Sequence, residues 1–172
     1  MIKIEDIVQL KAFARQDGAI LCLLWFVSFL AIMYMPESGL GNILALLTPI
    51  LVGWRLCAFR NYALGGYISF RRSCGYCVYT FVYSSMIFAL GQYLYFKFLD
   101  HGTFYAMLAT SAATMSEVYR QSGLSTQDID STLAMMKSLS PIHWAFLFMM
   151  QNFFVGFVLS LPIAAVCRRK HH

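Results

Sequence analysis

Residues 18–36 read GAILCLLWFVSFLAIMYMP, a stretch that carries no charged side chain between Asp17 and Glu37. A helix needs about 20 apolar residues to cross the roughly 30 Å hydrocarbon layer of a bilayer. The run is longer than the hydrophobic part of a secretory signal peptide, and no small-residue cleavage pattern precedes Glu37. The stretch therefore predicts a retained transmembrane helix over about residues 18–35.

Three further stretches have the same character. The chain of 172 residues is 59% hydrophobic and only 12% charged, whereas a soluble domain is about 25% charged. Membrane-crossing helices are predicted over about residues 40–55, 75–99 and 142–166. Pro49 predicts a kink in the second of them, which is also the shortest. The predicted fold class is all-α, an integral membrane four-helix bundle that forms a single domain over residues 1–172.

The one sizeable polar segment, about residues 100–140, lies between the third and fourth predicted spans. Apolar side chains recur at helical spacing on both sides of Ser122–Gly123, and glycine commonly follows the end of a helix. The segment therefore predicts an extracytoplasmic amphipathic helical hairpin, which either caps the bundle at the outer leaflet or binds a partner. The small residues 109–114 (ATSAAT) would let another helix approach closely, in this chain or in a homodimer.

The distribution of basic residues predicts the orientation in the membrane. Ten of the thirteen lysines and arginines lie before the first span, between the second and third, or after the fourth: Lys3, Lys11, Arg15, Arg55, Arg60, Arg71, Arg72, Arg168, Arg169 and Lys170. An even number of spans brings these segments to one side, and basic connections stay in the cytoplasm. We therefore predict that both termini are cytoplasmic. Nucleic acid is not a predicted partner, because topology alone accounts for these charges.

The stretch LGGYISFRRSCGYC, from Leu64 to Cys77, combines features of several kinds of site. Aromatic rings and arginines before a span are typical of an interfacial anchor, and arginines there reach lipid phosphates. A sharper hypothesis is a site for a phosphate-bearing lipid headgroup, with close backbone approach at a glycine pair. The candidate residues for this site are Arg60, Gly65, Gly66, Arg71 and Arg72.

Cys74 and Cys77 form a Cys-x-x-Cys pair at the start of the third span. A helix N-terminus stabilises a thiolate, which suits a membrane thiol oxidoreductase. The predicted topology, however, places the pair in the reducing cytoplasm, and the external segment has no cysteine that could pass electrons outward. Because two cysteines far from any histidine are too few for a zinc site, no metal and no cofactor are predicted.

Three amide side chains fall deep inside predicted spans: Gln92 in the third, and Gln151 and Asn152 in the fourth. Gln92 and Gln151 have a similar predicted depth, which favours an interhelical hydrogen bond worth about 0.6–2 kcal/mol. No acidic or basic residue is expected deep in a span, which disfavours a proton- or sodium-coupled transporter. No catalytic triad, phosphate-binding loop or dinucleotide-binding motif is recognisable, so no catalytic residue is predicted.

The segment YALGGYISFRRSCGY, residues 62–76, is similar to the LGGxISFxxAF segment of a bacterial family named domain of unknown function 4199. Residues 116–142, SEVYRQSGLSTQDIDSTLAMMKSLSPI, resemble a second segment of that family in the same order. The chain departs from the pattern at Arg71–Cys74, where the family more often has GQAF or GKAF. The resemblance implies a four-helix inner-membrane protein without an established activity, associated with glycosyltransferases that use polyprenyl phosphate.

These features together favour a multi-pass membrane protein that is not an enzyme. We expect an accessory or interaction subunit for a polyprenyl-phosphate glycosyltransferase or other envelope machinery, or a homodimer. One alternative is a small carrier or flippase for a lipid-linked sugar, which needs a polar groove that reaches both leaflets. A second alternative is a membrane thiol oxidoreductase that uses Cys74 and Cys77. His171 and His172 are assigned no role.

Overall fold

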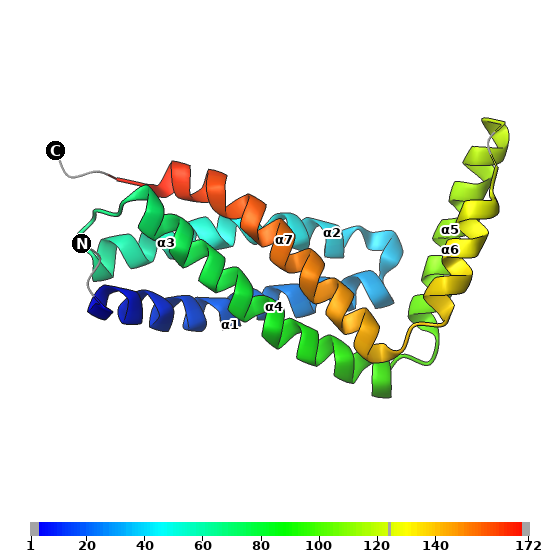
Figure 1. Cartoon of the computed structure of the whole chain (residues 1–172), viewed down its shortest axis with the longest axis horizontal. Helices are drawn as coiled ribbons and strands as arrows, with labels where there is room; N and C mark the ends of the chain where they lie inside the picture. The colour runs from blue at the N-terminus through cyan, green and yellow to red at the C-terminus, as the bar shows by residue number, and fades with distance from the viewer. Residues whose placement is uncertain (1–3, 124, 170–172) are drawn as a thin grey trace. The chain divides into compact units, whose positions relative to one another are not determined.

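The long apolar runs of the sequence form long helices. A computed structural model describes residues 4–123 and 125–169, so that Lys3, Lys170, His171 and His172 lie outside the described residues. The elements follow one another as α1 (Ile4–Tyr34), the 3₁₀ turn η1 (Pro36–Ser38), α2 (Leu40–Leu46), α3 (Thr48–Ala63), α4 (Phe70–Phe98), α5 (Thr103–Gln121), α6 (Gln127–Lys137) and α7 (Pro141–Cys167) (Figure 1). The predicted all-α fold class is confirmed.

Four helical segments are long and apolar enough to cross a membrane: Asp6–Tyr34, Leu40–Ala63, Phe70–Phe98 and Pro141–Cys167. The second is α2 followed by α3, with a break at Leu47. This break directly precedes Thr48–Pro49 and confirms the predicted kink, since proline has no N–H to continue the helical ladder. The first two segments reach beyond the apolar runs that predicted them, and they therefore contain polar residues.

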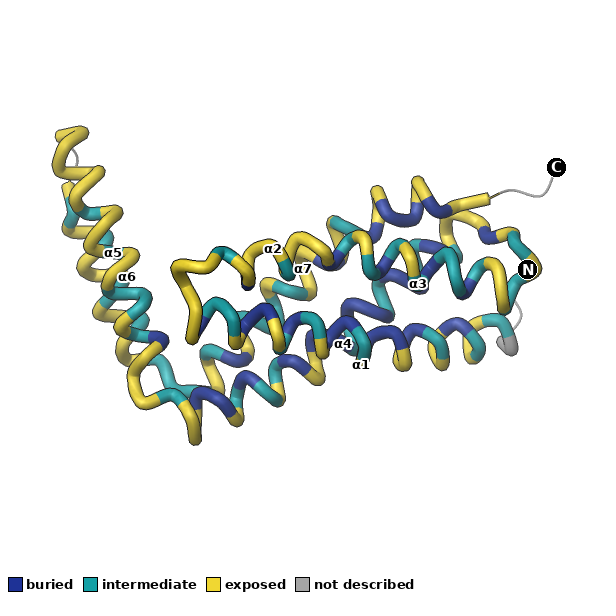
Figure 2. Tube along the Cα trace, turned by 180° about the vertical axis from the view of Figure 1, so that it is seen from behind, coloured by how far each residue is buried: buried dark blue, intermediate teal, exposed yellow. Residues whose placement is uncertain are grey.

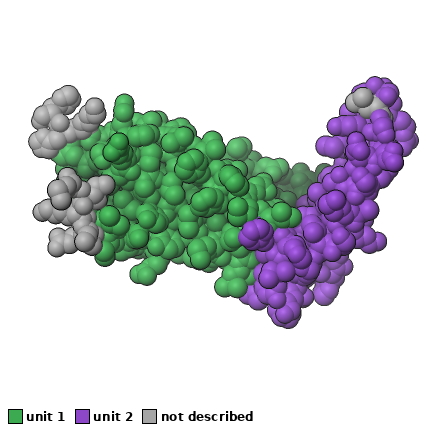
Figure 3. All heavy atoms as spheres, viewed as in Figure 1, with its two compact units in different colours: residues 1–90, 147–172 green, residues 91–146 purple. Residues whose placement is uncertain are grey.

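The chain divides into two compact units, coloured separately in Figure 3. The larger unit contains residues 1–90 and 147–172, and the smaller contains residues 91–146. The larger unit therefore holds α1, α2, α3 and most of α4 and α7. The smaller holds α5 and α6 with the adjoining ends of α4 and α7.

In the larger unit, α1 and α4 run in one direction while α3 and α7 run in the other (Figure 1). The start of α1 and the end of α7 therefore lie at the same end of this unit. A β-type pairing closes that end, where Ile68 N–H donates to the Arg169 carbonyl at 3.0 Å and Arg169 N–H donates to the Ile68 carbonyl at 3.1 Å. The turn before α4 is thus tied to the residues that follow α7.

Small residues allow the helices of the larger unit to approach closely. A methyl group added at Gly41 of α2 would lie 2.7 Å from the Ser28 carbonyl oxygen of α1, and one added at Gly156 of α7 would lie 2.6 Å from Phe81 Cβ of α4. The Ser28 hydroxyl donates to the Gly41 carbonyl at 2.7 Å. These are the small-residue contacts and interhelical hydrogen bonds by which membrane helices associate.

An aromatic core fills the space between these helices. Trp25 of α1 packs against Phe81 and Phe88 of α4, with ring centroids 6.2 Å and 5.7 Å apart. The indole N–H of Trp25 donates to the Thr48 hydroxyl at 3.0 Å, which satisfies its one polar atom. Figure 2 shows the buried stripes that run along α1 and α4.

In the smaller unit, α5 and α6 form a pair of helices, as the sequence predicts for this segment. Helix α5 ends at Ser122, and Gly123 then adopts the left-handed conformation with φ +72°. Glycine takes this conformation without strain, which explains why the helix stops here. Phe104 is buried in α5 and α6 buries no residue, so that most of both helices is exposed or half-buried (Figure 2).

Candidate functional site

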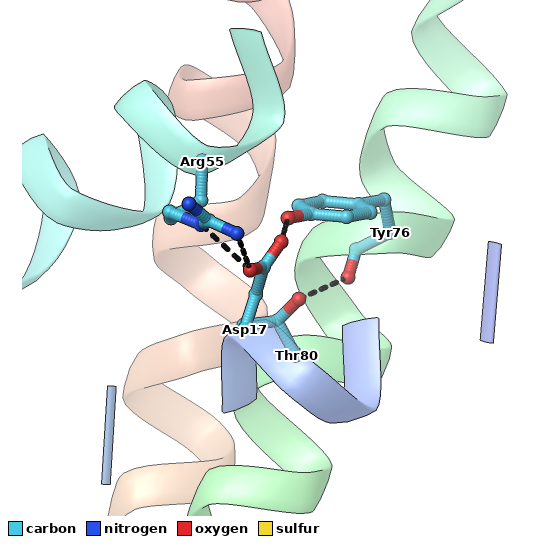
Figure 4. A network of polar contacts seen from close by, with 4 residues as sticks. All are labelled: Asp17, Arg55, Tyr76 and Thr80. Carbon is cyan, nitrogen blue, oxygen red and sulfur yellow. Dashed lines mark hydrogen bonds and ion pairs between the residues drawn. The ribbon is translucent and has the colours of Figure 1, made fainter. Parts of the chain in front are cut away.

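A buried carboxylate lies near the middle of α1. Asp17 is 2% exposed, and its Oδ1 atom accepts hydrogen bonds from Nε and Nη2 of Arg55 in α3 at 2.6 Å and 2.5 Å. The phenol of Tyr76 in α4 donates to the second carboxylate oxygen, Oδ2. Figure 4 shows these side chains converging on one point from three different helices. We call Asp17, Arg55 and Tyr76 the polar clamp.

Neighbouring residues fix the orientation of the clamp. The Tyr76 ring stacks on Phe59 with centroids 5.0 Å apart and an interplanar angle of 11°. Thr80 donates to the Tyr76 carbonyl at 2.9 Å, one turn further along α4 (Figure 4). The guanidinium of Arg55 lies 5.7 Å from the centroid of the Trp54 ring, a separation typical of a cation–π contact. The packing therefore holds both partners of Asp17 in place.

The clamp bears on one sequence-based expectation. The helical segments Asp6–Tyr34 and Leu40–Ala63, each long and apolar enough to span a membrane, contain Asp17 and Arg55. Both residues border apolar runs and therefore look like span ends, but the helices continue past them. The expectation of spans without deep acidic or basic residues, and with it the reason against an ion-coupled transporter, stays a prediction. Because guanidinium and phenol together satisfy both carboxylate oxygens, the clamp is best suited to holding α1, α3 and α4 together.

Three of the five predicted lipid-phosphate residues build the turn between α3 and α4. Arg60 Nη1 donates to the Cys167 carbonyl at 2.8 Å, and Arg60 Nε donates to Asn61 Oδ1 at 3.0 Å. Gly65 and Gly66 have φ values of +65° and +91°, and Gly66 N–H donates to the Arg60 carbonyl at 2.9 Å. Arg60 therefore caps the end of α7, while the glycine pair reverses the chain.

The other two predicted residues, Arg71 and Arg72, lie in the first turn of α4. Arg71 is exposed, and Arg72 is half-buried with its Nη2 atom 3.4 Å from Asp6 Oδ1 and 3.5 Å from Gln9 Oε1 of α1. A cavity of about 360 Å³ lies between the starts of α1 and α4, and both arginines line it. The structure thus separates the predicted set into a turn and a cavity.

The three predicted intramembrane amides have different surroundings. Gln92 is 1% exposed, and its Oε1 atom has no hydrogen-bond partner among the described residues. Asn152 is half-buried, whereas Gln151 is exposed. The expected hydrogen bond between Gln92 and Gln151 would join the two units, and it stays a prediction.

All five cysteines are free thiols. Cys77 is fully buried and Cys74 half-buried. The Cys167 thiol, at the end of α7, lies 3.6 Å from the Gly53 carbonyl oxygen of α3. Within residues 4–123 and 125–169, no three side chains of His, Cys, Asp or Glu lie close enough together to hold a metal ion. Of the Cys-x-x-Cys pair, Cys74 is therefore the thiol that a reagent in solution can reach.

A groove of about 430 Å³ runs between α5 and α6 in the smaller unit. Its apolar walls come from both helices, and small residues of α5 separate them. The residues that line it are Leu108, Ser111, Ala112, Met115, Tyr119, Asp128, Ile129, Thr132, Leu133 and Met136. We call this surface the hairpin groove. It contains two residues of the predicted close-approach segment 109–114, Ser111 and Ala112, together with Leu108 and Met115 on the same face of α5.

Residues 16–169 match the family described as "Protein of unknown function (DUF4199)". The matched range contains the polar clamp, both arginines of the α4 cavity and the hairpin groove. No curated protein matches the chain, and no solved structure matches it.

Proposed function

The chain belongs to the family described as Protein of unknown function (DUF4199), and from this premise we propose that it is a membrane-embedded subunit that binds another protein. In this proposal it is a non-enzymatic accessory protein of the bacterial inner membrane. Its partner is a polyprenyl-phosphate glycosyltransferase or another component of the envelope machinery. The observation that carries the proposal is the hairpin groove.

The groove has the properties of a surface that receives a helix. Two helices alone cannot enclose a core, and here Met115, which lines the groove, remains 54% exposed. Ser111 and Ala112 lie between the apolar walls, and small side chains let the backbone of a third helix approach closely. An apolar helix in such a groove is a recurring mode of peptide recognition. The proposed occupant is therefore an apolar helix of the partner protein.

A charge placed in the groove is expected to release the partner. Leu133→Lys puts an ammonium group into the apolar contact, whereas Ala134→Lys adds the same charge at an exposed position next to it. After purification in mild detergent, mass spectrometry should recover a stoichiometric partner with the wild type and with Ala134→Lys. Leu133→Lys should reduce recovery by about tenfold or more, which corresponds to at least about 1.4 kcal/mol.

Circular dichroism of both variants checks that the helices remain folded. Equal recovery with Leu133→Lys and Ala134→Lys would show that the groove does not bind the partner. If the groove-dependent partner is a second copy of this chain, the protein is a homodimer rather than an accessory subunit.

We further propose that both termini face the cytoplasm and that the hairpin lies outside. Asn61 at the end of α3 and Ser131 in α6 are exposed, so a cysteine at either position is open to reagents. In intact spheroplasts, a membrane-impermeant maleimide should label Ser131→Cys above the wild-type background. Asn61→Cys should react only after permeabilisation, since the positive-inside rule places its basic surroundings in the cytoplasm. The reverse labelling pattern would contradict this orientation.

A further inference from the structure

We propose that the starts of α1 and α4 form a binding site for a membrane lipid whose headgroup is a phosphate monoester. The site is the cavity of about 360 Å³ whose walls include Ile7 and Leu10 of α1 and Arg71, Arg72 and Tyr79 of α4. Small-molecule sites typically measure about 300–1,000 Å³, so this cavity has the size for a headgroup rather than for a whole lipid.

The two arginines have donors available for a ligand. Arg72 Nε is buried and has no hydrogen-bond partner among the described residues, while the two contacts of Nη2 are long at 3.4 Å and 3.5 Å. Arg71 is exposed and forms no ion pair with any described residue. A guanidinium presents five donors in a planar arrangement, which matches the oxygens of a phosphate group. A buried, unpaired donor beside a cavity is the feature that an anion would satisfy.

The charge around the cavity sets the charge of the ligand. Lys11 lies with its Nζ atom 5.1 Å from the centroid of the Tyr79 ring, which itself lines the cavity. The Asp6 carboxylate also lines the cavity and opposes an anion. Three cations and one carboxylate leave a net charge of +2 among these described side chains. A phosphate monoester carries about −1.5 to −2 at neutral pH, which matches this charge better than the single negative charge of a diester.

The position of the cavity favours a lipid over a soluble phosphate. Two of the candidate membrane spans begin at Asp6 and Phe70, and the cavity lies beside these first residues, at the edge of the membrane. Lipid headgroups occupy this depth, and basic residues beside a span attract anionic lipids there. Ile7 is 39% exposed next to the arginines and offers an apolar surface for the first part of an acyl or polyprenyl chain.

The test uses the full chain in nanodiscs of phosphatidylcholine. One set contains phosphatidic acid, which is a monoester, and the other contains phosphatidylglycerol, which is an anionic diester. Native mass spectrometry then measures the lipid that remains bound to the released protein. The wild type should retain phosphatidic acid over phosphatidylglycerol by about tenfold. Excess inorganic phosphate should not displace it.

Variants separate the cavity from the general charge of this surface. Arg71→Gln and Arg72→Gln should each abolish the preference for phosphatidic acid. Arg168→Gln removes an exposed arginine that does not line the cavity, and it should leave the preference unchanged. Because Arg71 forms no ion pair with a described residue, Arg71→Gln keeps the test valid if Arg72→Gln fails to fold.

Three results would overturn the proposal. Equal retention of both lipids, or an equal loss with Arg168→Gln and Arg71→Gln, would show attraction to surface charge only. Displacement by inorganic phosphate would show a site for a soluble anion instead. None of these results depends on the partner of the hairpin groove, so the failure of one proposal leaves the other intact.

Discussion

Arg55→Leu is expected to destabilise the larger unit by about 3–5 kcal/mol, because it leaves the Asp17 carboxylate buried without its cation. The Asp17 side chain is 1% exposed, so water cannot replace the lost guanidinium. Tyr76 can still donate its hydrogen bond, but a phenol does not neutralise the charge. Equilibrium unfolding in detergent micelles, followed by circular dichroism, measures the change in free energy.

Two companion variants test this explanation. Asp17→Leu should cost less than Arg55→Leu, because the Arg55 side chain is 24% exposed and can extend its charge toward the surface. The double variant Asp17→Leu/Arg55→Leu should also cost less than Arg55→Leu alone, since it leaves no unpaired buried charge. Arg15→Leu, at an exposed position of α1, should change stability by no more than about 0.5 kcal/mol. A double variant as unstable as the sum of its single variants would contradict the polar clamp.

Gly41→Ala is the second change with a large expected effect. The new methyl group would lie 2.7 Å from the Ser28 carbonyl oxygen and 2.9 Å from the Ile32 amide nitrogen, both of which are backbone atoms of α1. Since backbone atoms cannot move aside as side chains do, α1 and α2 must separate. Overpacking of this kind costs about 1–3 kcal/mol. The same unfolding experiment measures the change.

Gly53→Ala provides the matched control. A methyl group at Gly53 meets its nearest atom, Cys167 Sγ, at 3.7 Å, which is an ordinary contact distance. Both changes replace a helical glycine by alanine, which by itself favours the helix by up to about 1 kcal/mol. The difference between the two variants therefore isolates the close contact of α1 with α2. If both variants are equally stable, this contact does not limit the packing.

The membrane-crossing helices and the α5–α6 pair are predictable from the sequence because their signals are local. An uncharged run of about 20 residues is enough to indicate a span. Pro49 and Gly123 act on the backbone where they stand, and the helices break or end beside them. None of these inferences requires a residue from another part of the chain.

The polar clamp and the close glycine contacts are not predictable in this way, because each needs a distant partner. Asp17 and Arg55 look like the borders of apolar runs, and no pattern shows that these charges neutralise one another across 38 positions of the chain. Tyr76 similarly looks like an aromatic residue of the membrane interface. A glycine directly follows Asp17 in the sequence, and this small residue is a local hint that another helix comes close. The structure shows such a contact, since a methyl group at Gly18 would lie 3.0 Å from the Thr80 carbonyl oxygen.

The residues predicted to bind a lipid phosphate do not share one place in the fold, for a related reason. The sequence groups Arg60 with Arg71 and Arg72 because they share one basic loop, but Arg60 binds the Cys167 carbonyl across 107 positions. The α4 cavity instead takes Lys11 and the first turns of α1 into its surroundings. Proximity in sequence therefore groups Arg71 with Arg72 but does not show that residues of α1 line the same cavity.

The pairing of Ile68 with Arg169 also sets an order of events during biosynthesis. When a ribosome has released residue 68 into the membrane, about 100 further residues must still be made, which takes about 5–20 s at typical rates of synthesis. During that time Arg60 lacks the Cys167 carbonyl and the turn before α4 lacks its backbone partner. The first three spans therefore lack these contacts until α7 has been made.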